Sequence, residues 1–421
     1  MSARARLGYQ LGYNIFGRGL LRIERLRSER QLAQPDFWRS EHLAPPLHVA
    51  PRLKELISRH YLKGRFAEGA RKVAWVTSGA PIEFLTALDY FLIYPENHAA
   101  VCGIRRTAED LCGVAEDAGW SRDTCSYART DIGAMLSGRT PVGKLPKPDL
   151  LVCSTNICQT VLLWHRVLAD HFKVPLIVID TPFVYRKAGT HDTDFVERQL
   201  EDAIGIAEQI AGRSLDMVRL RQVTVAARDA VELWGQVMKR GAHRPAPLTA
   251  FDEFIHMAPI VEMRGQDFTV DYYHAMLAEL DARIANGVGA LKHERRRLIW
   301  DNLPIWHRIS WLSKQLAGRG VALVASTYTN AWAELARLID PDRPIASAAA
   351  CYMHPILNQG TGHKLATIKR MVLDFHADGV ILHSDRSCKP YSIGQMDQRD
   401  RLGREIGAPA LLLEADHNDP R

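Results

Sequence analysis

The chain has 421 residues, 47% of them apolar and 24% charged, and its formal net charge at pH 7 is +6. These values are typical of a soluble globular protein whose core needs no disulfide staples. The positive charge is concentrated in the N-terminal third and in residues 293–297, but it is modest for this length and too diffuse to indicate nucleic-acid binding. No apolar run approaches the roughly 18 residues that a membrane helix needs.

The chain has seven cysteines, an odd number with uneven spacing, which argues against a secreted disulfide framework. The arginines near the N-terminus are not followed by an apolar segment of signal-peptide length. We therefore expect a cytoplasmic protein in a reducing compartment. At roughly 100–200 residues per domain, the length allows two or three domains.

Residues 1–70 carry apolar side chains at helical spacing, interrupted by prolines, which predicts an N-terminal helical segment. After this segment the pattern changes to short apolar strands that alternate with helices. These strands are expected at 73–76, 91–94, 150–153 and 174–180, and helices at 82–90 and 160–171. Such alternation predicts βαβ units and a parallel sheet over residues 71–190, the first lobe.

Residues 191–295 are almost wholly amphipathic and predict a helical layer between two lobes, with helices at 195–210, 215–239 and 270–286. Strands return in a second lobe, residues 296–421, at 297–300, 321–326, 379–383 and 410–416, with helices at 361–376 and 394–405. The sequence thus predicts an α/β protein with two open parallel-sheet lobes of flavodoxin-like type. Neither a GxGxxG nor a Walker A motif is present.

Cysteines lie at or near the expected strand ends of both lobes, namely Cys102, Cys153, Cys158 and Cys388. Ligands of open α/β sheets bind at the carboxyl edge of the strands, so thiols of both lobes can meet in one cleft. Clusters of three or four thiolates bind zinc or iron–sulfur centres. No CxxC pair exists, which excludes a zinc ribbon.

A packed, unreactive thiol is the alternative interpretation for each cysteine, because free cysteine is among the most buried residue types. This interpretation is favoured for Cys112 and Cys125, which fall in a helical region without turn residues, and Cys351 ranks below Cys388. Cys153 and Cys158 are poorly spaced for two ligands of one iron, so one of them is expected to be a packed thiol.

Four segments together resemble the 2-hydroxyacyl-CoA dehydratase / benzoyl-CoA reductase family: SGAPIE at 78–83, YPENHAAVCG at 94–103, NICQT at 156–160 and SDRSCKPYS at 384–392. The stretch 295–309 resembles the family too, and the resemblance covers nearly all of the chain from residue 70. The CKPYS and NICQT forms look most like ATP-dependent benzoyl-CoA reductases, and the length looks like that of the larger of their two cluster-carrying subunits, the B-type one.

The resemblance implies a [4Fe–4S] cluster held by three cysteines, which by motif are Cys102, Cys158 and Cys388. It also implies a homologous smaller cluster-carrying subunit as partner, and ATPase or activator subunits with a bridging iron–sulfur cluster. Ferredoxin would supply the electrons and an acyl-CoA would be the substrate. Benzoyl-CoA would be reduced to a cyclohexadiene thioester, as in anaerobic degradation of aromatic compounds.

Three further residues are candidates for the catalytic pocket: Ser78, Glu96 and His98. Ser78 lies at a strand end before a helix N-terminus, where backbone N–H groups hold anions. Glu96 and His98 flank the expected loop toward Cys102 and could pass protons. The alternative interpretation of Glu96 is a helix-capping or ion-paired carboxylate, and that of His98 is a hydrogen-bonded loop histidine. Trp300, Trp306 and the basic run 295–297 could contribute to a coenzyme A binding site. Core packing is favoured for the two tryptophans, and a solvated face is favoured for the basic run.

Besides the reductase, the sequence allows a dehydratase subunit that acts through a ketyl radical, and a non-catalytic partner subunit that supplies half of a cleft. A zinc protein is a fourth interpretation, which predicts about one tetrahedral zinc per chain.

Overall fold

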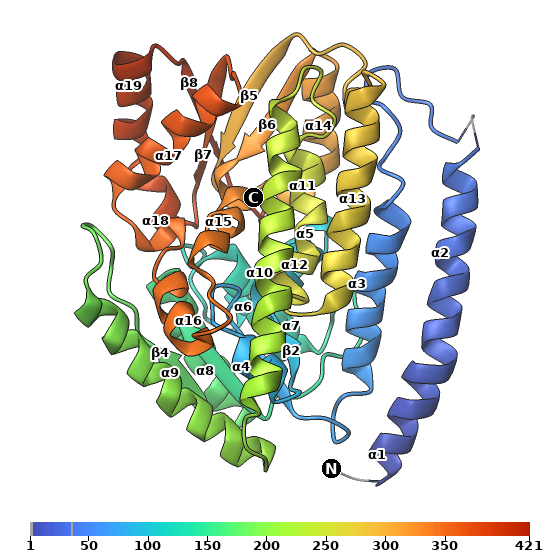
Figure 1. Ribbon diagram of the computed structural model, residues 1–421, viewed down its shortest axis with the longest axis vertical. Coiled ribbons are helices and arrows are strands. Elements are labelled where there is room, and N and C mark those ends of the chain that lie inside the picture. The colour runs from blue at the N-terminus through green and yellow to red at the C-terminus, as the bar shows by residue number, and fades with distance from the viewer. Residues whose placement is uncertain (1–2, 35–36) are drawn as a thin grey trace.

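The computed structural model describes residues 3–34 and 37–421. Two four-stranded sheets, all parallel, organise the described residues (Figure 1). The first contains β1 (Val73–Val76), β2 (Phe91–Ile93), β3 (Leu150–Ser154) and β4 (Leu176–Ile179). The second contains β5 (Arg296–Asp301), β6 (Val321–Ser326), β7 (Gly379–Asp385) and β8 (Ala410–Ala415). The predicted α/β fold with two parallel-sheet lobes is confirmed.

Both sheets have the same strand order. The first runs β2-β1-β3-β4 and the second runs β6-β5-β7-β8. In each, the chain starts in an inner strand, moves to one edge, and then crosses back to the other side. The strand order therefore reverses between β1 and β3 and again between β5 and β7. Ligands of open α/β sheets bind beyond the carboxyl ends of strands at such reversal points.

The helices of the first lobe are α4 (Glu83–Ala87), α5 (Pro95–Ile104), α6 (Ala108–Asp117), α7 (Ser126–Ser137) and α8 (Gln159–Phe172). The prediction of a loop between β2 and Cys102 is wrong, because helix α5 starts at Pro95 and continues through Cys102. Proline suits the first position of a helix, where its missing N–H costs nothing. Helix α4 ends before the predicted residue 90, since Asp89 has a positive φ of 64°.

The helices of the second lobe are α14 (Ile309–Ala317), α15 (Thr327–Ala333), α16 (Pro344–Tyr352), α17 (Thr361–Asp374), α18 (Lys389–Ser392) and α19 (Gln395–Ile406). The helical layer contains α9 (Thr190–Ala211), α10 (Met217–Lys239), α11 (Ala250–His256), α12 (Ala258–Glu262) and α13 (Asp267–Ala285). Helix α10 contacts α4 of the first lobe and α15 of the second, and its Trp234 is fully buried. The layer thus joins the two sheets into one body.

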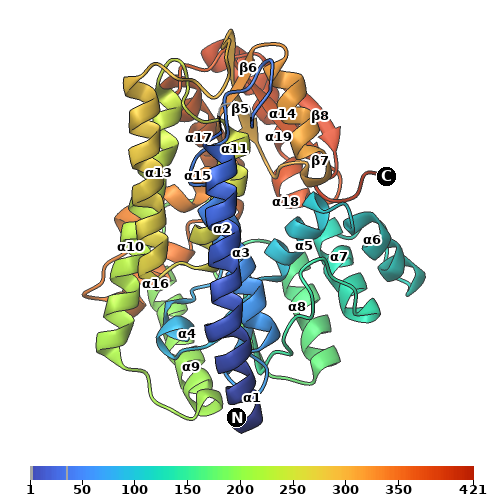
Figure 2. The ribbon, with the colours of Figure 1, turned by 90° about the vertical axis from the view of Figure 1, so that its right-hand side faces the viewer.

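The N-terminal segment contains α1 (Ala3–Gly8), the π-helical η1 (Tyr9–Gly17), α2 (Arg18–Leu32) and α3 (Ala50–Arg65). Figure 2 shows the first three as one continuous rod that runs along α3. The sequence predicts a helical segment here, but the π-helical stretch has no signal in the sequence. Within the described residues, no helix combines the length and the apolar character that crossing a membrane requires.

Candidate functional site

A cavity of about 140 Å³ lies where both sheets direct the carboxyl ends of their inner strands. Its wall includes Ser78 after β1, Cys158 after β3, Leu303 after β5 and Cys388 after β7. All four strands at the two points of reversed order therefore contribute a residue just beyond their ends. We call this space the thiol cavity, because three cysteines line it: Cys125, Cys158 and Cys388.

Each of the three cysteines immediately precedes a helix. Cys125 caps α7, Cys158 caps α8 and Cys388 caps the single turn α18. The N-terminus of a helix carries a partial positive charge and free N–H groups, which favour thiolates and other anions. Backbone N–H groups of Thr160 and Val161 act on the Cys158 thiol in this way.

The donor set of the thiol cavity fits an iron–sulfur cluster. Burial raises the pKa of the Cys158 thiol to about 12 and that of the Cys388 thiol well above its usual value. The Cys158 and Cys388 thiols therefore stay protonated unless positive charge is brought to them. A cluster of iron ions would bring that charge, and three cysteines from separate elements would leave one coordination position for another ligand.

The structure does not bring Cys102 into this set, because Cys102 does not line the cavity with Cys158 and Cys388. Cys102 lies two turns into α5 and is buried against Ala108, Leu111 and Ala134. Its sulfur is 3.6 Å from His98 Nε2. The sequence predicts a loop after β2, whereas in the structure helix α5 turns Cys102 away from the strand ends.

Cys125 lines the cavity together with Cys158 and Cys388, a position that the sequence analysis expects for Cys102. The sequence favours a packed thiol within a helical region at this position, but Cys125 stands directly before α7 rather than inside it. The shared position before a helix is a signal that could have grouped it with Cys158 and Cys388. Cys153 lies within β3, is fully buried in the core and does not line the cavity.

Glu96 reaches the thiol cavity from the first turn of α5, and Ser78 holds it there. Both the backbone N–H and the hydroxyl of Ser78 donate to Glu96 Oε1, at 3.1 and 3.3 Å. The other oxygen, Oε2, is buried and has no hydrogen-bond partner among the described residues. Burial raises the pKa of this carboxyl group to about 7. Glu96 can therefore hold a proton near neutral pH and present it to a molecule in the cavity.

His98 does not line the thiol cavity. It is fully buried, and its ring nitrogens lie 3.0 Å from Asp131 Oδ1 and 3.0 Å from Thr140 Oγ1. Although burial opposes its charge, the hydrogen bonds to Asp131 and Cys102 raise its pKa to about 10. His98 therefore joins α5 to α7 as a buried ion pair.

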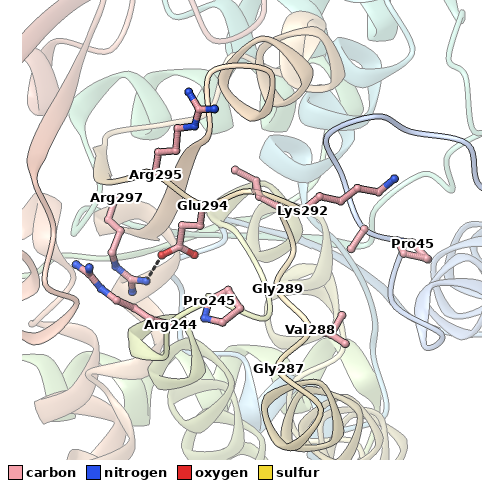
Figure 3. Close-up of a pocket in the computed structure, with 12 residues that line it drawn as sticks. Pro45, Arg244, Pro245, Gly287, Val288, Gly289, Lys292, Glu294, Arg295 and Arg297 are labelled. Carbon is pink, nitrogen blue, oxygen red and sulfur yellow. Dashed lines mark hydrogen bonds and ion pairs between the residues drawn. The ribbon is translucent and has the colours of Figure 1, made fainter.

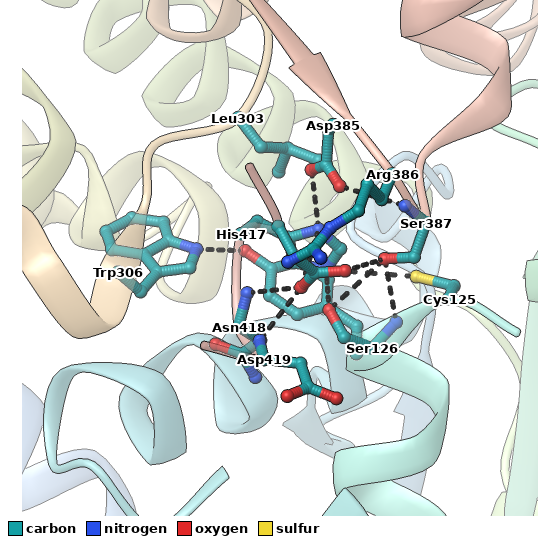
Figure 4. A network of polar contacts seen from close by, with 12 residues as sticks. Cys125, Ser126, Leu303, Trp306, Asp385, Arg386, Ser387, His417, Asn418 and Asp419 are labelled. Atoms are coloured by element: carbon teal, nitrogen blue, oxygen red, sulfur yellow. Dashed lines mark hydrogen bonds and ion pairs between the residues drawn. The ribbon is translucent and has the colours of Figure 1, made fainter. Parts of the chain in front are cut away.

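A buried polar network lies next to Cys125, one of the residues that line the thiol cavity (Figure 4). His417 Nδ1 is 2.6 Å from Asp385 Oδ2, and its Nε2 is 2.8 Å from Ser126 Oγ and 3.9 Å from Cys125 Sγ. The ligand atoms of Asp385, Asp416 and His417 lie within 4.8 Å of one another, as in a metal site. Each is already used inside the protein, however, since Ser387 donates to Asp416 at 2.6 Å. This network ties α7 of the first lobe to β7 of the second.

The basic run 295–297 lies away from the thiol cavity, beside a separate surface cavity of about 630 Å³ (Figure 3). Arg297 is fully buried and is bound to Glu294 and to the carbonyl groups of Phe375 and His243. Trp300 and Trp306 are core residues. Core packing, rather than a coenzyme A binding site, accounts for the side chains of Arg297, Trp300 and Trp306.

Comparison with known proteins identifies the family to which this arrangement belongs. The family model described as 2-hydroxyglutaryl-CoA dehydratase, D-component, matches residues 77–421. The chain belongs to this family. It is 31% identical over 373 residues to the (R)-2-hydroxyisocaproyl-CoA dehydratase alpha subunit of Clostridioides difficile, covering 88% of this chain and 90% of that one.

Other relatives span both activities that the sequence suggested. The chain is 29% identical over 384 residues to the B subunit of benzoyl-CoA reductase from Thauera aromatica, covering 87% of this chain and 89% of that one. It is also 29% identical over 399 residues to the alpha subunit of lactoyl-CoA dehydratase from Anaerotignum propionicum, covering 88% and 92%. The resemblance drawn from the sequence motifs is thereby confirmed at the level of the family.

Proposed function

We propose that this family member is the iron–sulfur subunit of an ATP-dependent benzoyl-CoA reductase, passing low-potential electrons to an aromatic acyl-CoA ring to give a cyclohexadiene carbonyl-CoA. The observation that carries this proposal is the wall of the thiol cavity. Six aromatic side chains line it: Tyr127, Trp164, Tyr328, Trp332, Tyr352 and Tyr391. Among the described residues that line it, none is basic. Such a wall suits an uncharged aromatic acyl group.

In this proposal Cys125, Cys158 and Cys388 hold a [4Fe–4S] cluster, which supplies electrons of low potential when bound. The aromatic wall positions the ring beside the thiols and excludes water, whose protons would otherwise consume the reductant. Glu96 holds a proton at Oε2, and Ser78 fixes the opposite oxygen so that Oε2 faces the cavity.

The proposed assembly includes other chains. The relatives are named as alpha or B subunits, which supports a complex of several subunits. We infer a homologous smaller cluster-carrying subunit, and an ATPase or activator pair with a bridging iron–sulfur cluster that takes electrons from ferredoxin. ATP hydrolysis in that pair is needed because adding an electron to an aromatic ring is strongly uphill.

A second candidate is a dehydratase of 2-hydroxyacyl-CoA thioesters. It is favoured by the (R)-2-hydroxyisocaproyl-CoA and (R)-phenyllactyl-CoA dehydratase alpha subunits, which are 31% and 27% identical to this chain. The substrates in their names carry apolar acyl groups, which the same cavity wall suits. The two candidates share the three thiols and differ in the substrate that is turned over.

The cluster is tested by measuring iron, acid-labile sulfide and the electron paramagnetic resonance spectrum of anaerobically purified protein with its partner subunit. About four irons per chain are expected. Replacing Cys125, Cys158 or Cys388 with alanine should remove or alter the signal. Cys102→Ala and Cys153→Ala are matched controls, since both thiols are fully buried outside the cavity, and both should keep the iron.

Iron that is lost in Cys102→Ala but kept in Cys125→Ala would restore the trio expected from the sequence. Zinc in place of iron, or no metal in any preparation, would end the cluster proposal for this chain.

The substrate is tested with the complete reduced complex and ATP, using benzoyl-CoA and (R)-phenyllactyl-CoA in parallel. The reductase proposal predicts a cyclohexadiene thioester from benzoyl-CoA with stoichiometric ATP hydrolysis. Loss of water from (R)-phenyllactyl-CoA, with benzoyl-CoA left unchanged, would establish the dehydratase instead. Turnover of neither compound by a complex with intact clusters would exclude both.

A further inference from the structure

The N-terminal arm, residues 3–32 (α1, η1 and α2), exposes a row of large apolar side chains. Phe16 and Leu20 are 65% and 67% exposed, and Ile23 and Leu26 are 49% and 40% exposed. None of the fifteen residues of α2 is buried. A surface helix of a globular protein normally turns its apolar stripe toward the core. This helix presents its stripe to the outside.

The stripe has the spacing of a docking helix. Phe16, Leu20 and Ile23 follow one another at i, i+4 and i+7, which places them on one face. Arg27 and Arg30 extend the same row by further steps of four and three residues. Helices that bind in grooves of other proteins use anchors at this spacing.

Ion pairs and close packing hold the arm against α3, while the apolar stripe stays exposed. Arg25 pairs with Glu55 of α3 at 2.8 Å, and Glu24 pairs with Lys54 at 2.6 Å. Gly17 lies so close to α3 that an added Cβ would be 2.6 Å from Leu62. In Figures 1 and 2 the arm runs along α3 at the edge of the molecule, with no further layer outside it.

The charge of the arm indicates what kind of surface it meets. Seven arginines and two glutamates leave it with a net charge of +5, most of the +6 of the whole chain. Both glutamates are paired within the chain, Glu24 with Lys54 and Glu29 with Arg25. A groove of about 570 Å³ lies between the arm and α3, and five arginines and one carboxylate are among the residues that line it: Arg18, Arg22, Arg25, Arg52, Arg59 and Glu55. Because Arg27 and Arg30 continue the row of the stripe, a surface that covers it is expected to carry carboxylates beside its apolar side chains.

We propose that the arm is a docking helix for another subunit of the complex, which presents apolar side chains between aspartates or glutamates. The arm of a second copy of this chain would bind poorly to this stripe, because two arms of net charge +5 repel each other. This inference rests on the proposed function only in assuming that the chain works within a complex. The arm lies before residue 77, where the family match begins, so the docking surface is separate from the thiol cavity.

The test uses the anaerobic complex that co-purifies with a tagged copy of this chain. Hydrogen–deuterium exchange should show residues 16–30 protected in the complex and released in the isolated chain. The double variant Leu20→Ser/Ile23→Ser and the double variant Arg27→Glu/Arg30→Glu should each raise the dissociation constant for the co-purifying subunit at least tenfold. The matched control is Leu373→Ser/Leu411→Ser, which alters two equally exposed leucines, 64% and 58%, on other elements. It should leave the dissociation constant unchanged.

Equal protection of residues 16–30 in both states, or unchanged affinity in both arm variants, would overturn the proposal. So would binding to phosphatidylglycerol vesicles that depends on Leu20 and Ile23 while subunit assembly does not, since the arm would then be a membrane-surface helix. The iron content of the arm variants should equal that of the wild type. Failure of the cluster proposal is thereby distinguished from failure of the docking proposal.

Discussion

Glu96 is the only carboxylate among the described residues that line the thiol cavity, and its Oε2 has no partner. Positioned general acids contribute roughly 10²–10⁴-fold to a rate. We therefore expect Glu96→Gln to lower turnover by about that factor, because glutamine occupies the same space and cannot give up a proton to the substrate. The iron content should not change. Turnover and iron measured on the same anaerobic preparation check both expectations.

Glu96→Gln should also change how stability depends on pH. The pKa of Glu96 rises from 4.5 to about 7 on folding, so its contribution to stability is lost as the pH rises through about 7. A glutamine at position 96 does not ionise, so the variant does not lose this stability at alkaline pH. The variant should therefore be more stable than the wild type at pH 8, by up to about 3 kcal/mol, and no more stable at pH 4.

Glu253 provides the matched control for Glu96. It is fully buried, its pKa is raised by burial to about 8, and its Oε1 has no partner, yet it does not line the cavity. Glu253→Gln should reproduce the gain in stability at alkaline pH and leave turnover unchanged. Equal losses of turnover in both variants would show that the effect of Glu96 comes from the fold and not from its proton.

At the scale of single residues, the sequence identified several of the residues that line the thiol cavity but not Cys125. Cys158, Cys388, Ser78 and Glu96 could be placed because each follows an apolar strand closely. Cys125 lies more than thirty residues after β2 and more than twenty before β3, so no strand end marks it. Only the folded chain shows that the start of α7 returns to the same cavity.

At the scale of elements, strand β5 depends on one member of its basic run. Arg297 is buried and donates to three carbonyl groups and to Glu294, whereas Arg295 is exposed. Removing one partner of a buried ion pair typically costs about 3–5 kcal/mol. We expect Arg297→Ala to destabilise the protein by about this amount, measured by urea unfolding. Arg295→Ala should change the free energy of unfolding by less than about 0.5 kcal/mol. Similar losses in the two variants would contradict this account.

The eight strands were all predicted within a few residues, because buried parallel strands are short apolar runs bounded by turn residues. The helix errors have local causes. Helix α4 ends early at a residue of positive φ, and α5 begins at a proline that the sequence pattern places in a turn. Proline stands equally well in a turn and at the first position of a helix, so the sequence could not separate the two.

At the scale of the whole molecule, the two parallel lobes could be predicted but the way they meet could not. Strand order and the packing of one lobe on the other depend on long-range contacts that no local pattern carries. One such contact joins α7 to the C-terminal segment, where Arg129 Nη1 is 2.8 Å from Asp419 Oδ2. Both side chains are buried. Ser126 and Ser387 add a second contact nearby, with the Ser126 N–H donating at 3.1 Å.

Asp419→Asn should loosen this contact between the lobes. Although burial opposes its charge, hydrogen bonds from Arg421 and Arg129 hold the pKa of Asp419 below its usual 3.8. Its stabilising contribution is therefore present above pH 3.8 and is lost as the pH falls through the lowered pKa. The variant should lose about 2 kcal/mol of unfolding free energy at pH 7, and the difference from wild type should shrink toward pH 3.

Asp397→Asn, at an exposed carboxylate 3.7 Å from Arg401, should show neither effect. Urea unfolding at both pH values decides this, because a loss at pH 7 that persists unchanged at pH 3 would mean that the Asp419 charge does not hold the lobes together.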